Sequence, residues 1–120
     1  QPLEAFELWL SKAVGLSACD FTFHMGVSRF DADAAKQLRQ IVDRGITSFK
    51  VFLAYKGFFG VDDDELYQTL KLAHDLDVIV TAHCENETLV SRLQQELLAA
   101  GKTGPEWHEP SRPTTVEASG

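Results

Sequence analysis

The sequence predicts an α/β fold made of parallel β/α units. Along the chain, its apolar residues alternate between the period of an amphipathic helix and the pattern of a strand. In order, the predicted elements are helix, strand, helix, strand, helix, strand, helix and loop. This alternation indicates right-handed crossovers and a parallel sheet covered by helices. Two architectures fit: a small doubly wound sheet, or a segment of a (β/α)8 barrel.

The first two helices have recognisable ends. Residues 3–14 carry apolar side chains at helical spacing and precede Gly15, a residue type common just past a helix end. Asp31 is predicted to cap the second helix, because its carboxylate accepts a hydrogen bond from a free N–H group of the first turn. Gly45 is predicted to follow the end of that helix.

The third and fourth helices have similar signals. Asp62 and Glu65 match a capping box at the start of the third helix. The apolar stripe of this helix consists of Leu66, Leu70, Ala73 and Leu76. Glu85 and Asn86 are interpreted as capping residues of the fourth helix, which Gly101 stops.

Three segments are predicted to be strands, at residues 20–27, 46–55 and 77–83. The second is rich in β-branched and aromatic residues. The third is a continuous apolar run, which is typical of a strand buried on both faces of a parallel sheet. Residues 102–120 are rich in Pro, Gly, Ser and Thr and are predicted to be loop. Functional groups are expected at the carboxyl ends of the strands.

Length and composition restrict the function. The 120 residues make one domain or part of one, since a complete barrel needs about 250. The net charge of −7 disfavours nucleic-acid binding, which requires a basic face. No apolar run is long enough to span a membrane, and no signal peptide is visible. With only two cysteines, Cys19 and Cys84, we expect no disulfide framework and a cytoplasmic location.

Lys50 is the most unusual residue of the second strand, because it lies between Phe49 and Val51 in an otherwise apolar run. Alternation places Lys50 and Phe52 on the same face. One interpretation is structural: the ammonium pairs with a carboxylate of a neighbouring strand or extends to the strand end. The other is chemical: burial favours the neutral amine, a nucleophile that forms a Schiff base or captures carbon dioxide as a carbamate. A carbamate has two oxygens with which to bridge two metal ions.

Further candidates follow the second and third strands. His83 ends the third strand, where an imidazole either binds a metal or makes a structural hydrogen bond. Tyr55 ends the second strand, and its hydroxyl either donates to a developing oxyanion or forms the wet tip of a packing aromatic. Phe58 and Phe59 form either an apolar lid over a pocket or an anchor in the core. One lysine and one histidine are too few for a metal site, which usually has three or four ligands.

Three segments of the chain are specific in combination: SFKVFLAYKG at 48–57, TAHCEN at 81–86 and GKTGPEWHEPSRP at 101–113. Together they resemble the dihydropyrimidinase and D-hydantoinase family of cyclic amidohydrolases. The interval from Lys50 to His83 also matches that family, and the resemblance covers nearly the whole chain.

The resemblance implies a fold and an activity. Residues 1–120 would form part of a larger amidohydrolase domain, roughly the third to fifth units of a (β/α)8 TIM barrel. The family hydrolyses the ring amide of dihydropyrimidines or 5-substituted hydantoins to N-carbamoyl amino acids. The implied partner is therefore a small cyclic ureide or imide, and the family is commonly homotetrameric. The implied cofactor is a pair of zinc ions.

The resemblance also implies roles for individual residues. Lys50 matches the lysine that is carboxylated on its amine and bridges the two zinc ions, and His83 matches a histidine ligand. Tyr55 matches the tyrosine that stabilises the oxyanion. The implied substrate lid contains Phe52, Phe58 and Phe59. The family's further ligands, a His-x-His pair, a histidine and an aspartate, lie on strands that these 120 residues do not include, so we expect the isolated chain to be inactive.

Two other functions remain open. Collapsin-response-mediator-like proteins resemble the same family but act through protein–protein contacts without the metal centre. Lys50 argues against such a non-catalytic scaffold, because Leu or Val would be more stable at that strand position. A stand-alone flavodoxin-like binding module would place a ligand at a topological switch point, but no glycine-rich phosphate loop follows any strand.

Overall fold

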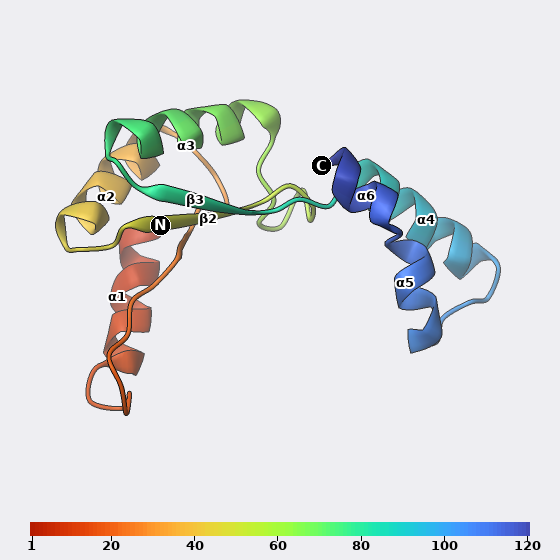
Figure 1. The fold of residues 1–120 in the computed structure, drawn as a ribbon, viewed down its shortest axis with the longest axis horizontal. Coiled ribbons are helices and arrows are strands. Elements are labelled where there is room, and N and C mark those ends of the chain that lie inside the picture. Colours follow the sequence, from red (N-terminus) through yellow and green to blue (C-terminus); the bar gives the residue numbers. More distant parts are fainter.

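A computed structural model describes all residues from 1 to 120 and contains a three-stranded parallel sheet with helices between the strands. The elements are α1 (Pro2–Ala13), β1 (Met25–Gly26), α2 (Ala32–Asp43), β2 (Ser48–Phe52), α3 (Asp63–Asp75), β3 (Ile79–His83), α4 (Glu87–Ala99), the 3-10 helix η1 (Pro105–Trp107), α5 (His108–Ser111) and α6 (Thr114–Ser119). The strands lie in the order β1-β2-β3 (Figure 1). The predicted α/β class with a parallel sheet is confirmed.

The core lies between the sheet and the helices α2 and α3, which pack on one of its faces (Figure 1). Phe49 and Val51 of β2 point into this core and are fully buried. Leu38 and Ile41 of α2 are equally buried against them. Alternation along β2 therefore divides its side chains into a core face and an opposite face.

The opposite face of the sheet carries the candidate residues. Lys50 pairs in register with Gly26 of β1 and Thr81 of β3, and Phe52 pairs with His83. Lys50 and Phe52 are only half-buried, because no element of the chain covers this face.

The prediction that residues 77–83 are buried on both faces is wrong. Ile79 of β3 is 69% exposed, and Ala82 is exposed as well. β3 is the last strand of the sheet, so nothing lies along its outer edge. The exposed apolar face and the unpaired edge of β3 could pack against and pair with further structure.

The first predicted strand is much shorter than expected. Residues 20–27 contain only the two-residue strand β1. Phe21 and Phe23 instead form an aromatic cluster with Phe6 of α1, with ring centroids 5.5 Å apart for Phe21–Phe23 and 6.1 Å for Phe6–Phe23. These contacts direct the segment toward α1 before it reaches the sheet.

The caps predicted for α2 and α3, and the glycines predicted to follow α2 and α4, are confirmed. Asp31 accepts from the Ala34 N–H group at 2.8 Å, and Asp62 and Glu65 form the expected capping box. Gly45 and Gly101 follow α2 and α4 with φ values of 95° and 71°, which glycine adopts without a steric penalty.

The predicted apolar stripe of α3 is partly wrong, because the helix turns a different side toward the core than its leucines indicate. Leu70 is 47% exposed, whereas Thr69 and Leu72 face the core. Thr69 is tolerated there because its hydroxyl donates to the Glu65 carbonyl at 2.7 Å. The buried face of α3 is thus centred one position away from the stripe read from its leucines.

The tail is helical instead of a loop. Pro105 occupies the first turn of η1, and Pro113 is the N-cap of α6. Proline starts helices as readily as it stops them, because its fixed φ suits the first turn. The tail docks on α4 through Val116, which is 1% exposed and whose carbonyl accepts from the Asn86 N–H group at 3.1 Å.

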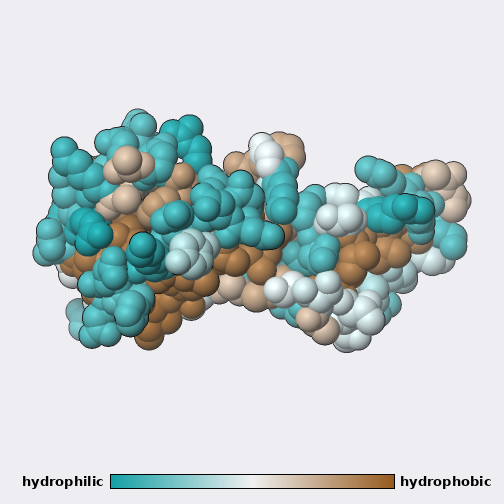
Figure 2. All heavy atoms as spheres, turned by 90° about the horizontal axis from the view of Figure 1, so that it is seen from above, coloured by the Kyte–Doolittle hydropathy of each residue, from teal (hydrophilic) through white to brown (hydrophobic).

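The molecule is extended. Its radius of gyration is 17.0 Å, whereas a compact chain of this length has about 14 Å. Figure 2 shows a larger and a smaller group of atoms joined by a narrower waist, with apolar atoms at the surface of both. In Figure 1 the smaller group is formed by α4, α5 and α6, beyond the carboxyl ends of the strands. None of the helices is long and apolar enough to cross a membrane.

The cap of α2 predicts an effect of pH. The Ala34 N–H group and the neighbouring Arg29 hold the pKa of Asp31 below its usual value of 3.8. A lowered pKa in the folded state means that the carboxylate stabilises the fold above pH 3.8 and that this contribution is lost as the pH falls through the lowered value. Asp31→Asn keeps an acceptor oxygen but removes the charge. Its unfolding midpoint is therefore expected to fall less on acidification from about pH 5 to about pH 3.

Thermal unfolding followed by circular dichroism across this pH range measures the effect. Asp75→Asn, at an exposed position of α3, is the matched control. If the unfolding midpoint falls equally with pH in Asp31→Asn and in the unaltered chain, the charge of the cap makes no such contribution.

Candidate functional site

Lys50 lies in the middle of β2 without an acidic partner. None of the ion pairs of the chain involves it. Its Nζ atom lies 5.0 Å from the centre of the Phe52 ring, a weak cation–π contact. The chain therefore does not supply the ion pair that is one of the two structural interpretations of Lys50.

Four aromatic rings gather beyond Lys50 at the carboxyl ends of β2 and β3. Phe52 is central, with ring centroids 4.9 Å from Phe59, 5.7 Å from His83 and 6.3 Å from Tyr55. Tyr55 also stacks on His83, at 5.9 Å and an interplanar angle of 26°. The structure thus brings together Phe52, Tyr55, Phe59 and His83, from two strands and the loop after β2.

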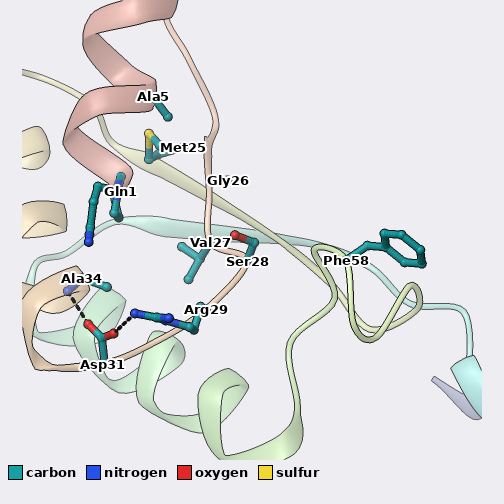
Figure 3. A pocket seen from close by; sticks show the side chains of 11 residues that line it. Gln1, Ala5, Met25, Gly26, Val27, Ser28, Arg29, Asp31, Ala34 and Phe58 are labelled. Carbon is teal, nitrogen blue, oxygen red and sulfur yellow. Dashed lines mark hydrogen bonds and ion pairs between the residues drawn. The ribbon is translucent and has the colours of Figure 1, made fainter.

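Phe58 does not join this cluster. It is 88% exposed, and Figure 3 shows its ring directed outward from the loop. It lies at the rim of a cavity of about 440 Å³ between the start of α1 and the segment from Met25 to Asp31. Of the two adjacent phenylalanines, only Phe59 packs its ring against the other aromatic rings of the site.

The backbone of Tyr55 is fixed in an unusual conformation. Its φ of 66° lies in the left-handed region, which costs a non-glycine residue about 1 kcal/mol or more. The Tyr55 carbonyl accepts from the N–H groups of Phe58, Phe59 and Gly60 at 3.1 to 3.3 Å. The Tyr55 N–H group donates to the carboxylate of Glu87, in the first turn of α4. These contacts hold the tyrosine where the strand ends.

Gly60 allows the loop to close on Tyr55. A Cβ atom at this position would lie 2.1 Å from the Ala54 carbonyl oxygen and 2.9 Å from the Lys56 nitrogen, both backbone atoms. Only glycine fits such a close approach. The loop between Tyr55 and Val61 therefore depends on this residue type.

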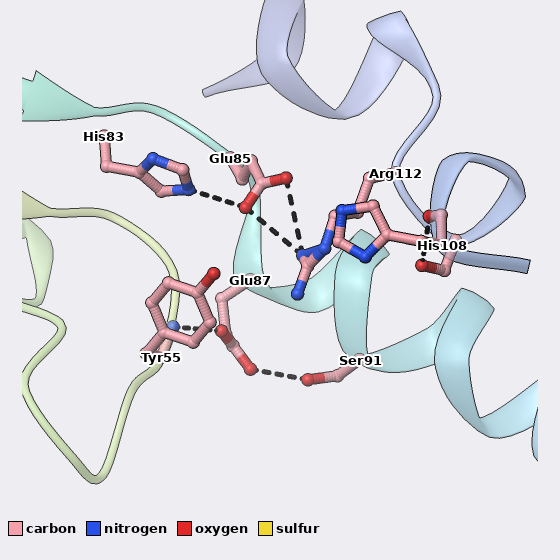
Figure 4. Close-up of polar contacts among 8 residues, drawn as sticks. Tyr55, His83, Glu85, Glu87, Ser91, His108 and Arg112 are labelled. Atoms are coloured by element: carbon pink, nitrogen blue, oxygen red, sulfur yellow. Dashed lines mark hydrogen bonds and ion pairs between the residues drawn. The ribbon is translucent and has the colours of Figure 1, made fainter. Parts of the chain in front are cut away.

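His83 is held by a chain of charged groups. Its Nε2 lies 2.6 Å from Oε2 of Glu85. Arg112 of the tail donates through Nη1 to the same carboxylate, at 3.2 Å and 3.4 Å from the two oxygens (Figure 4). The Glu85 and Arg112 side chains are only 10% and 15% exposed. The Arg112 guanidinium also lies 5.9 Å from the centre of the Tyr55 ring.

Sequence analysis missed the three charged residues that support the site: Glu85, Glu87 and Arg112. Glu85 does not cap α4; the cap is Asn86 alone, whose side chain accepts from the Leu89 N–H group at 3.2 Å. Two features of the sequence could have indicated this arrangement. Glu85 follows His83 by two residues, and Arg112 lies in one of the segments that carry the family resemblance.

The donor set fits part of a metal centre. No group of three or more His, Cys, Asp and Glu side chains could hold a metal ion. Lys50 and His83 nevertheless lie on the same face of adjacent strands, because His83 pairs with Phe52, two residues after Lys50. Nε2 of His83 contacts Glu85, and no hydrogen bond of the chain involves its Nδ1. The chain therefore places two donor groups, on Lys50 and His83, on one face of the sheet.

Parallel strands joined by helices, with polar side chains at their carboxyl ends, place the chain in the α/β class of proteins. Known proteins narrow this class. No family model matches the chain. D-hydantoinase of Geobacillus stearothermophilus is 40% identical over 119 residues, which cover 98% of this chain and 25% of the relative. Dihydropyrimidinase of Rattus norvegicus is 35% identical over 117 residues, 97% of this chain and 22% of the relative.

Solved structures agree with these relatives. D-hydantoinase (dihydropyrimidinase) from Thermus sp. is 68% identical, with a TM-score of 0.96, over 100% of this chain and 26% of that one. L-hydantoinase from Arthrobacter aurescens matches at 27% identity and a TM-score of 0.84, over 99% of this chain and 26% of that one. The chain belongs to the D-hydantoinase/dihydropyrimidinase family. It spans about a quarter of the length of the curated relatives it matches.

Proposed function

We propose that the chain is a segment of the catalytic barrel of a zinc-dependent cyclic amidohydrolase. The observation that carries the proposal is Lys50, which has no acid partner and lies on the same face of the sheet as His83. The identity to hydantoinases and dihydropyrimidinases over nearly the whole chain supports it. The substrate would be a dihydropyrimidine or a 5-substituted hydantoin, opened to an N-carbamoyl amino acid.

The residues of the chain have separate roles in this proposal. Lys50, carboxylated on its amine, and His83 would hold two zinc ions together with ligands from outside these residues. Zinc, when bound, supplies an activated water at neutral pH and polarises the ring carbonyl. The Tyr55 hydroxyl would donate to the oxygen of that carbonyl as negative charge develops on it.

The aromatic rings would form the apolar side of the substrate site. Phe52 and Phe59 pack beside Tyr55 and would exclude water from the ring amide. The exposed ring of Phe58 would serve as a movable part of the lid over a bound substrate. In the complete barrel these residues would belong to roughly the third to fifth β/α units, in a homotetrameric cytoplasmic enzyme.

A chimera tests the proposal directly. The matching segment of the Thermus sp. enzyme is replaced by residues 1–120, which the 68% identity makes compatible in packing. We expect the chimera to hydrolyse hydantoin and dihydrouracil, to lose activity on removal of zinc by a chelator, and to regain it on addition of zinc. A folded chimera without turnover would contradict the proposal and favour the alternative of a non-catalytic scaffold.

The isolated chain is expected to be inactive. It has two of the required ligands and a sheet with a free edge, so zinc has no complete site. The measurement is hydrolysis of dihydrouracil by the 120-residue chain with excess zinc. Metal-dependent turnover above that of a Lys50→Ala chain would overturn this expectation.

A further inference from the structure

We infer that Glu85, held in place by Arg112, is a positioning residue that orients His83 and fixes which of its ring nitrogens is free. This inference rests on the proposed function, because it concerns His83 as a metal ligand. Glu85 and Arg112 themselves touch neither substrate nor metal in this arrangement; they act through the imidazole.

The direction of the hydrogen bond follows from the partners of Glu85. Its carboxylate accepts from the Arg112 guanidinium at 3.2 Å and 3.4 Å, and a guanidinium only donates. A carboxylate that accepts from a guanidinium at both oxygens is the acceptor toward His83 as well, so we assign the 2.6 Å contact as a donation from Nε2–H. A neutral imidazole protonated at Nε2 has its lone pair on Nδ1.

The position of Arg112 explains why Glu85 stays in place. The guanidinium lies on the side of the carboxylate away from His83, so the carboxylate is held from both sides (Figure 4). The Arg112 and Glu85 side chains are almost completely buried. A buried ion pair adds little stability over apolar side chains of the same volume, so its value here is in geometry.

The inference also assigns a purpose to the helical tail. Arg112 lies between α5 and α6, and α6 docks on the start of α4 through Val116 and Asn86. Asn86 additionally donates to the Ser119 hydroxyl at 2.8 Å. The tail thereby delivers its arginine to the end of β3, 29 residues along the chain from His83.

The test uses the zinc affinity of the chimera, measured as the chelator concentration that removes half of the bound zinc. Hydrogen-bonded partners of a ligating histidine typically contribute about 10- to 100-fold to metal affinity. We expect Glu85→Ala to lower the required chelator concentration by about 10- to 100-fold, Glu85→Gln by less, and Arg112→Met by an intermediate amount. The exposed pair of Arg92 and Glu96 on α4 provides the controls Arg92→Met and Glu96→Ala, which should leave it unchanged.

A double variant separates positioning from general structural support. If Glu85 acts through His83, Glu85→Ala has no further effect on zinc affinity in a chimera that already carries His83→Ala. A further loss of the same size in that background would overturn the inference, as would unchanged zinc affinity for Glu85→Ala alone. The Co²⁺ absorption spectrum should also change in Glu85→Ala, because the remaining ligand is reoriented.

The same variants distinguish this inference from the proposed function. If His83→Ala leaves zinc affinity unchanged, His83 is not a ligand and the proposed function fails with it. If His83→Ala weakens zinc binding and Glu85→Ala does not, only the positioning role fails. Thermal unfolding of the zinc-free variants identifies any loss of affinity that merely reflects unfolding.

Discussion

Replacing Lys50 by alanine in the chimera is expected to remove hydrolysis almost entirely. In the proposed site the Lys50 amine would carry the carbamate that helps to hold the zinc ions, and its removal would cost several kcal/mol of stabilisation of the developing charge. At 1.36 kcal/mol per factor of ten, this corresponds to a fall in kcat of roughly 10³-fold or more. The measurement is steady-state hydrolysis of hydantoin, together with the zinc content of the purified protein.

Two controls separate the chemistry of Lys50 from its charge. Lys50→Arg keeps a cation on the strand but has no neutral amine to capture carbon dioxide, so it should be as inactive as Lys50→Ala. Lys71→Ala, at an exposed position of α3, should retain full activity. Substantial turnover in Lys50→Arg would show that Lys50 contributes only its positive charge.

Tyr55→Phe in the chimera is expected to lower kcat by about 10²- to 10³-fold, the usual effect of removing one hydrogen-bond donor from an oxyanion site. The ring and the left-handed backbone are retained, so the contacts with Phe52 and His83 should persist. In the proposed role the hydroxyl would act only as charge develops, so KM should change far less than kcat.

Tyr67 on α3 provides the matched control for Tyr55. It is 62% exposed and its ring contacts none of the aromatic rings of the site, so Tyr67→Phe should leave both constants unchanged. An effect of Tyr55→Phe on KM alone would mean that the hydroxyl binds substrate and does not assist the reaction.

The helix ends were predictable because their causes are local. Asp31, Asp62, Gly45 and Gly101 act on backbone groups within three or four residues, so a short stretch of sequence contains both partners. The alternation that places Lys50 and Phe52 on one face is equally local. These features required no knowledge of the tertiary structure.

The errors in the fold arose where distant contacts outweigh local pattern. Residues 20–24 have the composition of a strand, but packing of Phe23 on Phe6 takes them away from the sheet. The leucine stripe of α3 indicates a face centred on Leu70, but the sheet selects Thr69 and Leu72. Residues 102–120 have the composition of a loop, yet their prolines start helices that dock on α4.

Only part of the site could be read from the sequence. The alternation along β2 indicates Lys50, and the strand ends indicate Tyr55 and His83. Glu85, the partner of His83, lies 27 residues before Arg112, so no local pattern connects the two. The sequence also does not distinguish a buried arginine in a polar tail from an exposed one. The Glu87 contact with the Tyr55 N–H group likewise joins residues 32 positions apart.

The three N–H groups that converge on the Tyr55 carbonyl tie the position of this residue to the conformation of the loop that follows it. Opening the loop would break these bonds and release the left-handed turn, so the tyrosine hydroxyl would leave its place as the entrance widens. Substrate entry and assembly of the oxyanion donor would then be one event on one timescale. In such an enzyme a looser loop would speed product release. It would also lower the fraction of time that the Tyr55 hydroxyl spends in place as a donor.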